Sequence, residues 1–293
     1  MFLCTERPFD RAVLETARLP HRPVPSPRLS ASFPIRFGRA LAKSARVLLD
    51  FRPDVLVGLG GYGCVPPVTA AALMGIPYVL LEQNILPGRA NRTLAPMAAR
   101  VYAQWEGTRL RGRILAAGSP LRPGLRRVSR EEACLRLGLD PRRPTVLVLG
   151  GSQGAEALNA IEIRAQSVRI TGRGRSAQGT VVREYVNEME VAYSAADLAV
   201  SRAGALAIAE LAYFGVPTVL VPYPRAAENH QRANARALGN AVWVIEEARI
   251  DRVGEIVAKL VSGDPEIHNR GRAFHRYARP DAARVIAEDL GRI

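Results

Sequence analysis

The sequence predicts an α/β protein in which two Rossmann-like domains, each built on a parallel sheet, face each other across a cleft. Short apolar strands alternate with helical segments along most of the chain, which is typical of a parallel sheet covered by helices. The alternation stops at a turn-rich segment near residue 141 and then starts again. The length of 293 residues also suits two domains.

Short apolar runs in the first half predict strands at residues 1–4, 53–59, 77–81, 101–104 and 113–117. An alanine-rich segment at residues 69–74 is predicted to be helical. Ser129 is a typical N-cap for a helix that runs to about Leu137, and turn residues follow that helix. We therefore expect a first domain at residues 1–140, a second at 141–277 and a C-terminal helix at 278–293.

The second half repeats the alternation, with strands predicted at residues 145–149, 197–200, 217–221 and 241–245 and helices at 204–214 and 229–238. Ligands of open parallel sheets bind at the carboxyl ends of the strands. Glycine-rich turns follow three of the predicted strands, at residues 60–63, 150–154 and 202–204. These turns are where we expect the functional sites.

The chain is strongly basic, because 41 Lys and Arg outnumber 27 Asp and Glu and give a formal net charge of +14. Such a charge favours anionic partners, which are nucleic acid, an anionic membrane surface or phosphorylated substrates. No recognition motif for nucleic acid accompanies the charge, so no nucleic-acid partner is predicted. The three cysteines lie far apart without metal-ligand spacing, and neither a metal nor another cofactor is predicted.

The glycine-rich turn at residues 150–154 admits three interpretations. Its backbone N–H groups could bind phosphate at the start of a helix. The same residues match the nucleophile elbow of hydrolases, with Ser152 as the nucleophile and Asp197 and His230 following in the required order. The third interpretation is a plain strand-to-helix turn.

Two charged residues near the turn at 202–204 are candidates for a nucleotide site. Arg202 could bind a diphosphate through two parallel N–H groups. Glu210 lies in an otherwise apolar helix and could accept hydrogen bonds from a ribose diol, or it could be a capping or salt-bridged carboxylate. Further along, His230, Gln231 and Asn234 suit sugar hydroxyls, or they form a solvated helix start.

A basic amphipathic segment lies near the start of the chain. Its apolar residues are Phe33, Phe37 and Leu41, and its basic residues include Arg36, Arg39 and Lys43. This combination suits anionic lipid headgroups, although a helix packed on its own sheet would show a similar stripe. The longest apolar stretches, residues 65–81 and 203–221, are interrupted by proline, glycine or glutamate and are not predicted to span a membrane.

Several stretches taken together resemble the MurG family of bacterial peptidoglycan transferases, which convert lipid I to lipid II. They are residues 53–63, 75–84, 118–122, 146–159, 182–196, 201–210 and 217–234. The resemblance implies an inverting glycosyltransferase of the GT-B fold that needs no metal and acts in cell wall synthesis. It also implies a peripheral position on the cytoplasmic side of the inner membrane.

The implied partners are UDP-N-acetylglucosamine as the donor, undecaprenyl-diphospho-muramoyl-pentapeptide (lipid I) as the acceptor, and an anionic membrane surface. Ser152 and Gln153 would lie near the donor diphosphate and sugar, and Glu210 would hold the ribose. The other implied donor residues are Arg122, Val186, Met189, Arg202, Gly204, Leu206, His230, Gln231 and Asn234. The lipid diphosphate would face Gly60, Gly61, Tyr62, Glu82, Gln83 and Asn84, of which Glu82 and Tyr62 are candidates for the general base.

Three features depart from the family pattern. The glycine-rich loop ending in Gly-Gly-His is not in this sequence, whose residues 1–4 correspond to the second strand of the family. Residues 161–180 form a shorter segment than the family has, and residues 203–207 lack two hydroxyl side chains. A relic that binds UDP-sugar or membrane without transferring a sugar is therefore one alternative, and a serine hydrolase that uses Ser152 is another.

Overall fold

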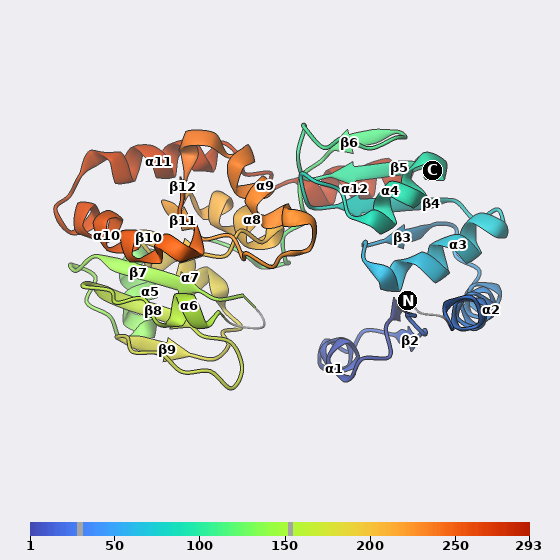
Figure 1. Ribbon diagram of the computed structural model, residues 1–293, viewed down its shortest axis with the longest axis horizontal. Coiled ribbons are helices and arrows are strands. Elements are labelled where there is room, and N and C mark those ends of the chain that lie inside the picture. Colours follow the sequence, from blue (N-terminus) through green and yellow to red (C-terminus); the bar gives the residue numbers. More distant parts are fainter. Residues whose placement is uncertain (28–31, 152–154) are drawn as a thin grey trace. The chain divides into compact units, whose positions relative to one another are not determined.

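The computed structural model describes residues 1–27, 32–151 and 155–293. The chain forms two compact units (Figure 1). Unit 1 comprises Met1–Ala117 and Arg284–Ile293, and unit 2 comprises Gly118–Ala283. The boundary predicted near residue 141 therefore lies inside unit 2, and the predicted C-terminal helix contributes to both units.

The predicted domain boundary lies too late in the chain because it is based on turn-forming residues, which carry no information about tertiary contacts. Arg130, in the helix before the turn, donates to the Asp197 carboxylate at 2.7 Å and to the Ala195 carbonyl at 3.0 Å. These bonds span more than 60 residues of the chain and attach the helix to unit 2. The helix itself begins as predicted, since the Ser129 side chain accepts a hydrogen bond from the Glu132 N–H.

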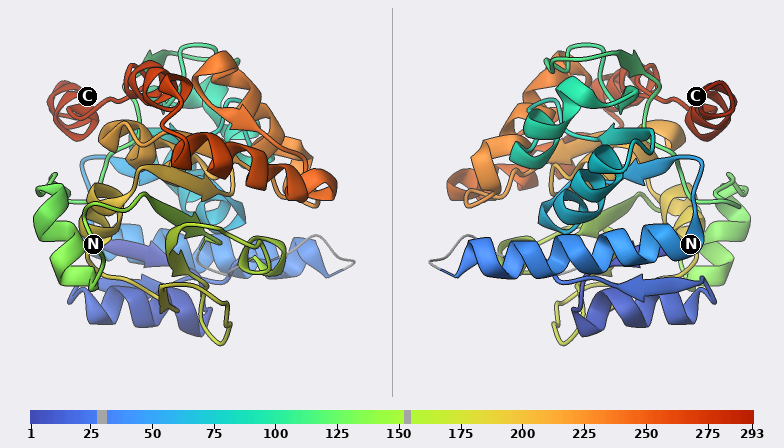
Figure 2. Two further views of the ribbon diagram at one scale, coloured as in Figure 1. Left: turned by 90° about the vertical axis from the view of Figure 1, so that its left-hand side faces the viewer. Right: turned by 90° about the vertical axis from the view of Figure 1, so that its right-hand side faces the viewer.

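Unit 1 contains two parallel sheets instead of the single sheet predicted. Its helices and strands are β1 (Phe2–Cys4), α1 (Pro8–Thr16), β2 (His21–Pro23), α2 (Phe33–Phe51), β3 (Leu56–Gly58), α3 (Val65–Leu73), β4 (Tyr78–Glu82), α4 (Arg89–Leu94), β5 (Arg100–Ala103), β6 (Ile114–Ala116) and α12 (Ala282–Leu290). Strands β1 and β2 form one sheet, and β3, β4, β5 and β6 form the other in that order. Helix α2 is one continuous helix (Figure 2).

Two apolar clusters hold the four-stranded sheet of unit 1. Val68 of α3 packs with Leu80 and Val101 on one side. Val79 and Tyr102 pack with Ile286 of α12 in the other cluster. Because side chains alternate along a strand, residues 79 and 80 of β4 belong to opposite faces, and α12 covers the second one.

Unit 2 is a single six-stranded parallel sheet with helices packed against it. Its elements are α5 (Arg130–Leu137), β7 (Thr145–Leu149), α6 (Glu156–Asn159), β8 (Gln166–Ile170), β9 (Val181–Arg183), α7 (Met189–Ala195), β10 (Leu198–Ser201), α8 (Ala205–Phe214), β11 (Thr218–Leu220), α9 (His230–Ala237), β12 (Trp243–Val244), α10 (Val253–Val261) and α11 (Pro265–His275). The strand order is β12-β11-β10-β7-β8-β9. Its core includes Val146, Val148, Leu198 and Val200 from the central strands and Val257 of α10.

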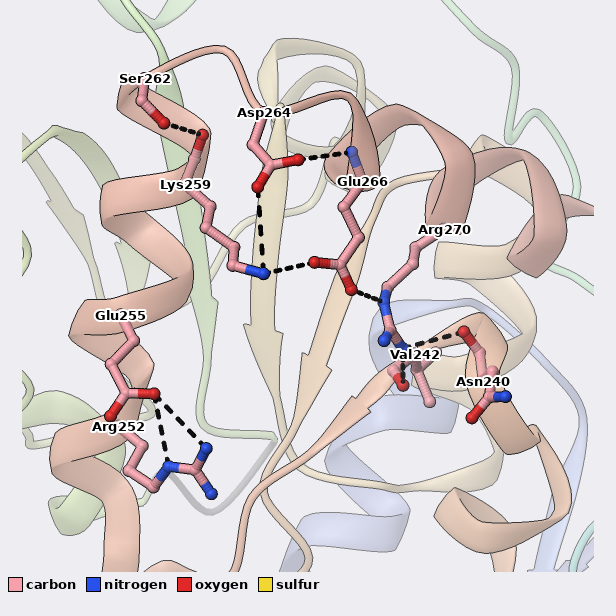
Figure 3. Close-up of polar contacts among 9 residues, drawn as sticks. All are labelled: Asn240, Val242, Arg252, Glu255, Lys259, Ser262, Asp264, Glu266 and Arg270. Atoms are coloured by element: carbon pink, nitrogen blue, oxygen red, sulfur yellow. Dashed lines mark hydrogen bonds and ion pairs between the residues drawn. The ribbon is translucent and has the colours of Figure 1, made fainter.

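Helices α10 and α11 are joined by a network of charged side chains (Figure 3). Glu266 contacts the ammonium of Lys259 and accepts from Arg270 Nε at 2.9 Å. Arg270 also donates to the carbonyls of Asn240 at 2.9 Å and Val242 at 2.8 Å. The network therefore ties the helix pair to the segment that enters β12.

Candidate functional site

The glycine-rich turn after β7 is described only in part. Gly151 has a φ of 77°, which is the left-handed region that favours glycine. Ser152 and Gln153 lie outside the described residues, so their predicted roles stay predictions. The helix that follows, α6, has only four residues.

Glu210 is the centre of a buried polar cluster in unit 2. It is 8% exposed. Its Oε1 accepts hydrogen bonds from Arg122 Nε at 3.2 Å and Nη2 at 3.1 Å, and its Oε2 accepts from the Tyr193 hydroxyl at 2.6 Å. Three segments far apart in the sequence therefore meet at one carboxylate, and its charge is matched as burial requires.

Tyr193 strengthens this cluster as a hydrogen-bond donor. Burial, followed by the neighbouring Glu210 carboxylate, raises the pKa of Tyr193 well above its usual value. The phenol therefore keeps its proton and donates a hydrogen bond to Glu210. The cluster holds the Glu210 carboxylate in one position.

Arg122 also reaches the loop before α7, where the predicted uracil contacts lie. Its Nη1 is 3.5 Å from the Asn187 carbonyl. Val186 is half-buried in this loop, and Met189 is buried at the start of α7. The structure therefore brings Arg122, Glu210 and the Val186–Met189 segment together.

Arg202 is held by groups of its own unit. Its Nη1 donates to the carbonyls of Val221 at 3.2 Å and Pro222 at 3.5 Å, and its Nη2 contacts the Glu247 carboxylate. The guanidinium also lies over the Tyr223 ring, 5.3 Å from its centroid. A diphosphate would have to compete with Glu247 for this side chain.

The other predicted donor residues cluster around α8 and α9. Gly204 is the N-cap of α8, and Leu206 in the first turn is 46% exposed. Gln231 accepts from the Tyr223 N–H at 2.9 Å, and the fully buried Asn234 donates to the Ala203 carbonyl at 3.3 Å. Both amides therefore fix the backbone of the loops that carry the site.

His230 is the half-buried first residue of α9. It follows Glu228 and Asn229, whose φ angles of 52° and 56° are left-handed. This backbone conformation ends the preceding turn and fixes where α9 begins.

The hydrolase interpretation of the turn at 150–154 is wrong. Asp197 precedes β10, its N–H donates to the Thr145 carbonyl at 2.9 Å, and its carboxylate accepts from Thr145 N–H and Arg130. Thr145 is the first residue of β7, whereas the turn follows the last one. Five strand residues separate the two ends by roughly 16 Å, so Asp197 lies at the opposite end of β7 from Gly150 and Gly151, which open the turn.

In unit 1, the turn after β3 contains the first group of predicted acceptor residues. Gly60 and Gly61 have φ angles of 85° and 73°, which only glycine adopts without strain. Tyr62 follows them and is 57% exposed. The turn therefore presents backbone and one phenol to solvent.

Glu82 has a structural environment. It is 3% exposed, and its carboxylate accepts from Asn84 N–H at 2.9 Å, Gly88 N–H at 3.0 Å and Asn91 Nδ2 at 2.9 Å. The Gln83 carbonyl accepts from the Trp105 indole at 3.0 Å. Glu82 thus holds residues 82–91 in place. Its carboxylate oxygens already accept hydrogen bonds from this loop, whereas a general base needs an oxygen that is free to accept the proton of the substrate.

Helix α2 carries the residues predicted to contact the membrane. Phe33, Phe37 and Leu41 are half-buried, and Leu41 packs with Leu48. The predicted apolar stripe is therefore largely the packed face of the helix. The apolar side chains exposed on α2 are Ile35 (67%), Leu49 (62%) and Phe51 (51%), and they share the helix surface with exposed Arg36, Arg39, Lys43 and Arg46.

Sequence reasoning missed two buried partners of the predicted carboxylates. Tyr193 donates to Glu210, and Asn91 donates both to Glu82 and to the Leu81 carbonyl. Tyr193 lies in the largely buried helix α7, but Asn91 lies in the polar helix α4, so no common sequence pattern marks the two residues, and the partner of each one is set by tertiary contacts.

The described part of the chain contains neither a metal-ligand cluster nor a membrane-spanning helix. No group of three or more His, Cys, Asp or Glu side chains is placed to hold a metal ion there. None of the helices formed by those same residues is long and apolar enough to cross a membrane.

Two segments of the chain match the two domains of one known protein family. Residues 1–103 match the glycosyltransferase family 28 N-terminal domain, and residues 162–286 match the glycosyltransferase family 28 C-terminal domain. The crystal structure of Acinetobacter baumannii MurG has a TM-score of 0.78 and 23% identity, and the match covers 99% of this chain and 90% of that one. The GT-B fold class predicted from the sequence is confirmed.

Curated relatives are similar over nearly the whole chain. A UDP-N-acetylglucosamine–N-acetylmuramyl-(pentapeptide) pyrophosphoryl-undecaprenol N-acetylglucosamine transferase of Halothermothrix orenii is 32% identical, with 96% of this chain and 85% of the relative aligned. The enzyme of the same name from Protochlamydia amoebophila is 35% identical over 95% of this chain and 82% of its own length. On this similarity the chain belongs to the MurG family of N-acetylglucosamine transferases, within glycosyltransferase family 28.

Proposed function

We propose that this protein transfers N-acetylglucosamine from UDP-N-acetylglucosamine to undecaprenyl-diphospho-muramoyl-pentapeptide, with inversion at the anomeric carbon, to form lipid II. Membership of the family named for this reaction is the observation that carries the proposal. UDP and the transferred sugar would bind in unit 2, where the described donor residues lie. The lipid diphosphate would bind at the turns of unit 1 that contain Gly60–Tyr62 and Glu82–Asn84.

The cluster around Glu210 supports the donor site. A carboxylate held by Arg122 and Tyr193 keeps its position, so it can accept hydrogen bonds from a ribose diol without reorganising. Arg122 links that carboxylate to the loop of Val186 and Met189, which would contact the uracil. The ribose and base would thus be recognised by one connected group of side chains.

In the reaction, a hydroxyl of the acceptor sugar would attack the anomeric carbon and UDP would leave from the opposite side. The N-terminus of α8 would offer backbone N–H groups to the departing diphosphate. A general base would accept the proton of the attacking hydroxyl. Tyr62 remains a candidate on grounds of exposure, whereas Glu82 is engaged in its own loop.

Substitution of Glu210 tests the donor site. Glu210→Ala should weaken UDP-N-acetylglucosamine binding by roughly 10- to 100-fold, because a charged hydrogen-bond acceptor is lost. Isothermal titration calorimetry measures the affinity, and Glu190→Ala in α7, a half-buried carboxylate outside the cluster, is the matched control. An affinity unchanged in Glu210→Ala would contradict the assignment.

We also propose that α2 docks the protein on the cytoplasmic face of the inner membrane. Its exposed apolar residues and its four exposed basic residues support this surface, which differs from the stripe expected from the sequence. Basic residues near an anionic surface contribute about 1 kcal/mol each. The docking would bring the acceptor turns of unit 1 to their lipid substrate.

Vesicle binding tests this surface. The triple variant Arg36→Gln/Arg39→Gln/Lys43→Gln should bind phosphatidylglycerol vesicles roughly 100-fold more weakly in co-sedimentation. Ile35→Ser should also weaken binding, whereas Leu135→Ser, an 81% exposed leucine of unit 2, should not. Equal binding by all variants would contradict docking through α2.

A catalytically inactive relic is the second candidate, favoured by the departures of residues 203–207 from the family pattern. A transfer assay with labelled UDP-N-acetylglucosamine and lipid I separates the two. Donor binding without label in lipid II would favour the relic.

A further inference from the structure

Unit 2 contains a cavity that the donor site does not use. It has a volume of about 780 Å³, within the usual range for small-molecule sites. Its walls come from residues 159–163 and 165, from Ser167 and Arg169 of β8, and from residues 176–180. These segments lead into β8 and β9, whereas the predicted donor residues Val186 and Met189 follow β9, Gly204 and Leu206 follow β10, and His230 follows β11.

The short connections around β8 leave this space open. Helix α6 has four residues, and no helix forms between its end and β8 or between β8 and β9, a stretch that the structure describes completely. Ser167 and Arg169 pair in register with Val146 and Val148 of β7, so the four side chains share one face of the sheet. Apolar packing covers the two valines, whereas Ser167 and Arg169 line the cavity.

Arg169 is a buried cation without a carboxylate partner among the described residues. It is 2% exposed, and its guanidinium donates to the carbonyls of Leu158 at 3.4 Å, Asn159 at 3.1 Å and Ile161 at 2.6 Å. Its Nε is buried without a hydrogen-bond partner in the described structure. Burial lowers the pKa of Arg169, and no charged group is among the causes of that shift. Burying a charge in this way is costly unless another group offsets it.

The other polar groups around the cavity suit a small polar ligand. Ser167 and Thr180 are hydrogen-bonded to each other across the wall, and the buried Oδ1 of Asn159 has no partner among the described residues. The lining also includes the side chains of Ser176 and Gln178. The carboxylate in the lining, Glu162, is 78% exposed and paired with Arg164 at 3.1 Å, so it points its charge toward solvent.

We propose that this cavity binds a small anionic ligand, with a carboxylate or phosphate group that offsets the charge of Arg169 and hydroxyl or amide groups that meet the polar lining. The anion would not need to replace the three carbonyl bonds of the guanidinium. The ligand would bind independently of the donor, because none of the cavity residues belongs to the donor site.

Calorimetric titration of the full chain tests the proposal, with inorganic phosphate and acetate as probes at constant ionic strength. The titration is run with and without saturating UDP, so that uptake of phosphate by the donor site is distinguished from binding in the cavity. We expect one saturable isotherm for at least one probe. Arg169→Gln and Ala177→Phe, which fills the cavity from its wall, should each weaken binding at least about tenfold. Arg173→Gln removes an equal charge at an exposed position outside the cavity lining and should leave the affinity unchanged.

Two outcomes would overturn the proposal: no saturable binding of either probe to the wild type, or equal affinity in wild type and Ala177→Phe. Arg169 caps the end of α6, so the variant Arg169→Gln could fail to fold. In that case the affinity of Ala177→Phe decides the question. The UDP titration that precedes each measurement reports separately on the donor site.

Discussion

The buried carboxylates of Glu82 and Glu210 have different partners. The hydrogen bonds to Glu82 come from its own loop, residues 84–91, so the carboxylate serves as the acceptor for N–H groups of that loop. Glu210 is bonded by Arg122, 88 residues away, and by Tyr193. Hydrogen bonds between neighbouring residues fix the conformation of a loop, whereas bonds between distant residues bring separate segments together at one site. We therefore assign Glu82 a structural role and Glu210 a role in ligand binding.

Glu82→Gln should destabilise unit 1 by about 1–3 kcal/mol, because one carboxylate oxygen becomes an NH₂ group that faces N–H donors. Thermal denaturation measures the change. The exposed Glu6→Gln, whose Lys43 pair is 3.5 Å apart, should change stability by less than about 1 kcal/mol. A Glu82→Gln protein with native stability but strongly reduced kcat would instead favour Glu82 as the base.

Among the secondary-structure elements, α10 and α11 are connected by charge as well as by apolar packing. Contacts with Lys259, then with Arg270, lower the pKa of Glu266. Because the folded-state pKa is lowered, the stabilisation is present above the ordinary pKa of glutamate. It is lost as the pH falls through the lower pKa of the folded state.

Glu266→Gln should therefore lower stability by about 1 kcal/mol at pH 7, and the difference from wild type should vanish at acidic pH. Denaturant unfolding at pH 7 and pH 3 measures it. Glu255→Gln, in an exposed pair with Arg252, is the control. A difference that stays constant with pH would show that the charge of Glu266 is not involved.

Over the whole molecule, the chain passes from unit 1 to unit 2 and then returns. The return places α12 against β5, where Arg100 Nε and the Tyr102 hydroxyl each donate to Asp289 at 2.9 Å. Burial alone would raise the pKa of Asp289, but the hydrogen bonds from Tyr102 and Arg100 outweigh it and lower the pKa. Burial, then the bond to Asp289, raises the pKa of Tyr102 to about 12. Unit 1 therefore depends on the last residues of the chain.

Asp289→Asn should lower the stability of unit 1 by about 1–3 kcal/mol and leave unit 2 unchanged. Scanning calorimetry, with UDP added to shift only the transition of unit 2, distinguishes the two. Glu288→Gln, whose Arg284 pair lies on the exposed side of α12, should have little effect. An equal fall in both transitions would contradict the separate role of α12.

Periodic and local features were predictable from the sequence. The strand at 145–149 agrees residue for residue because a β-branched threonine and four apolar residues lie between Pro144 and Gly150. The N-cap at Ser129 agrees because capping is a contact over three residues. In contrast, α3 begins at Val65, earlier than predicted, because prolines fit the first turn of a helix, where their missing N–H is not needed.

The sequence by itself determined the parallel α/β fold, the family and which polar residues to consider, since these depend on local patterns and on motif order. Only the tertiary structure decided the unit boundaries, the partners of Glu210 and Glu82, the exposed face of α2 and the buried charge of Arg169. Each of these depends on contacts between residues distant in the chain. Burial and hydrogen bonding at such contacts decide whether a side chain can act as a ligand group or serves as part of the framework.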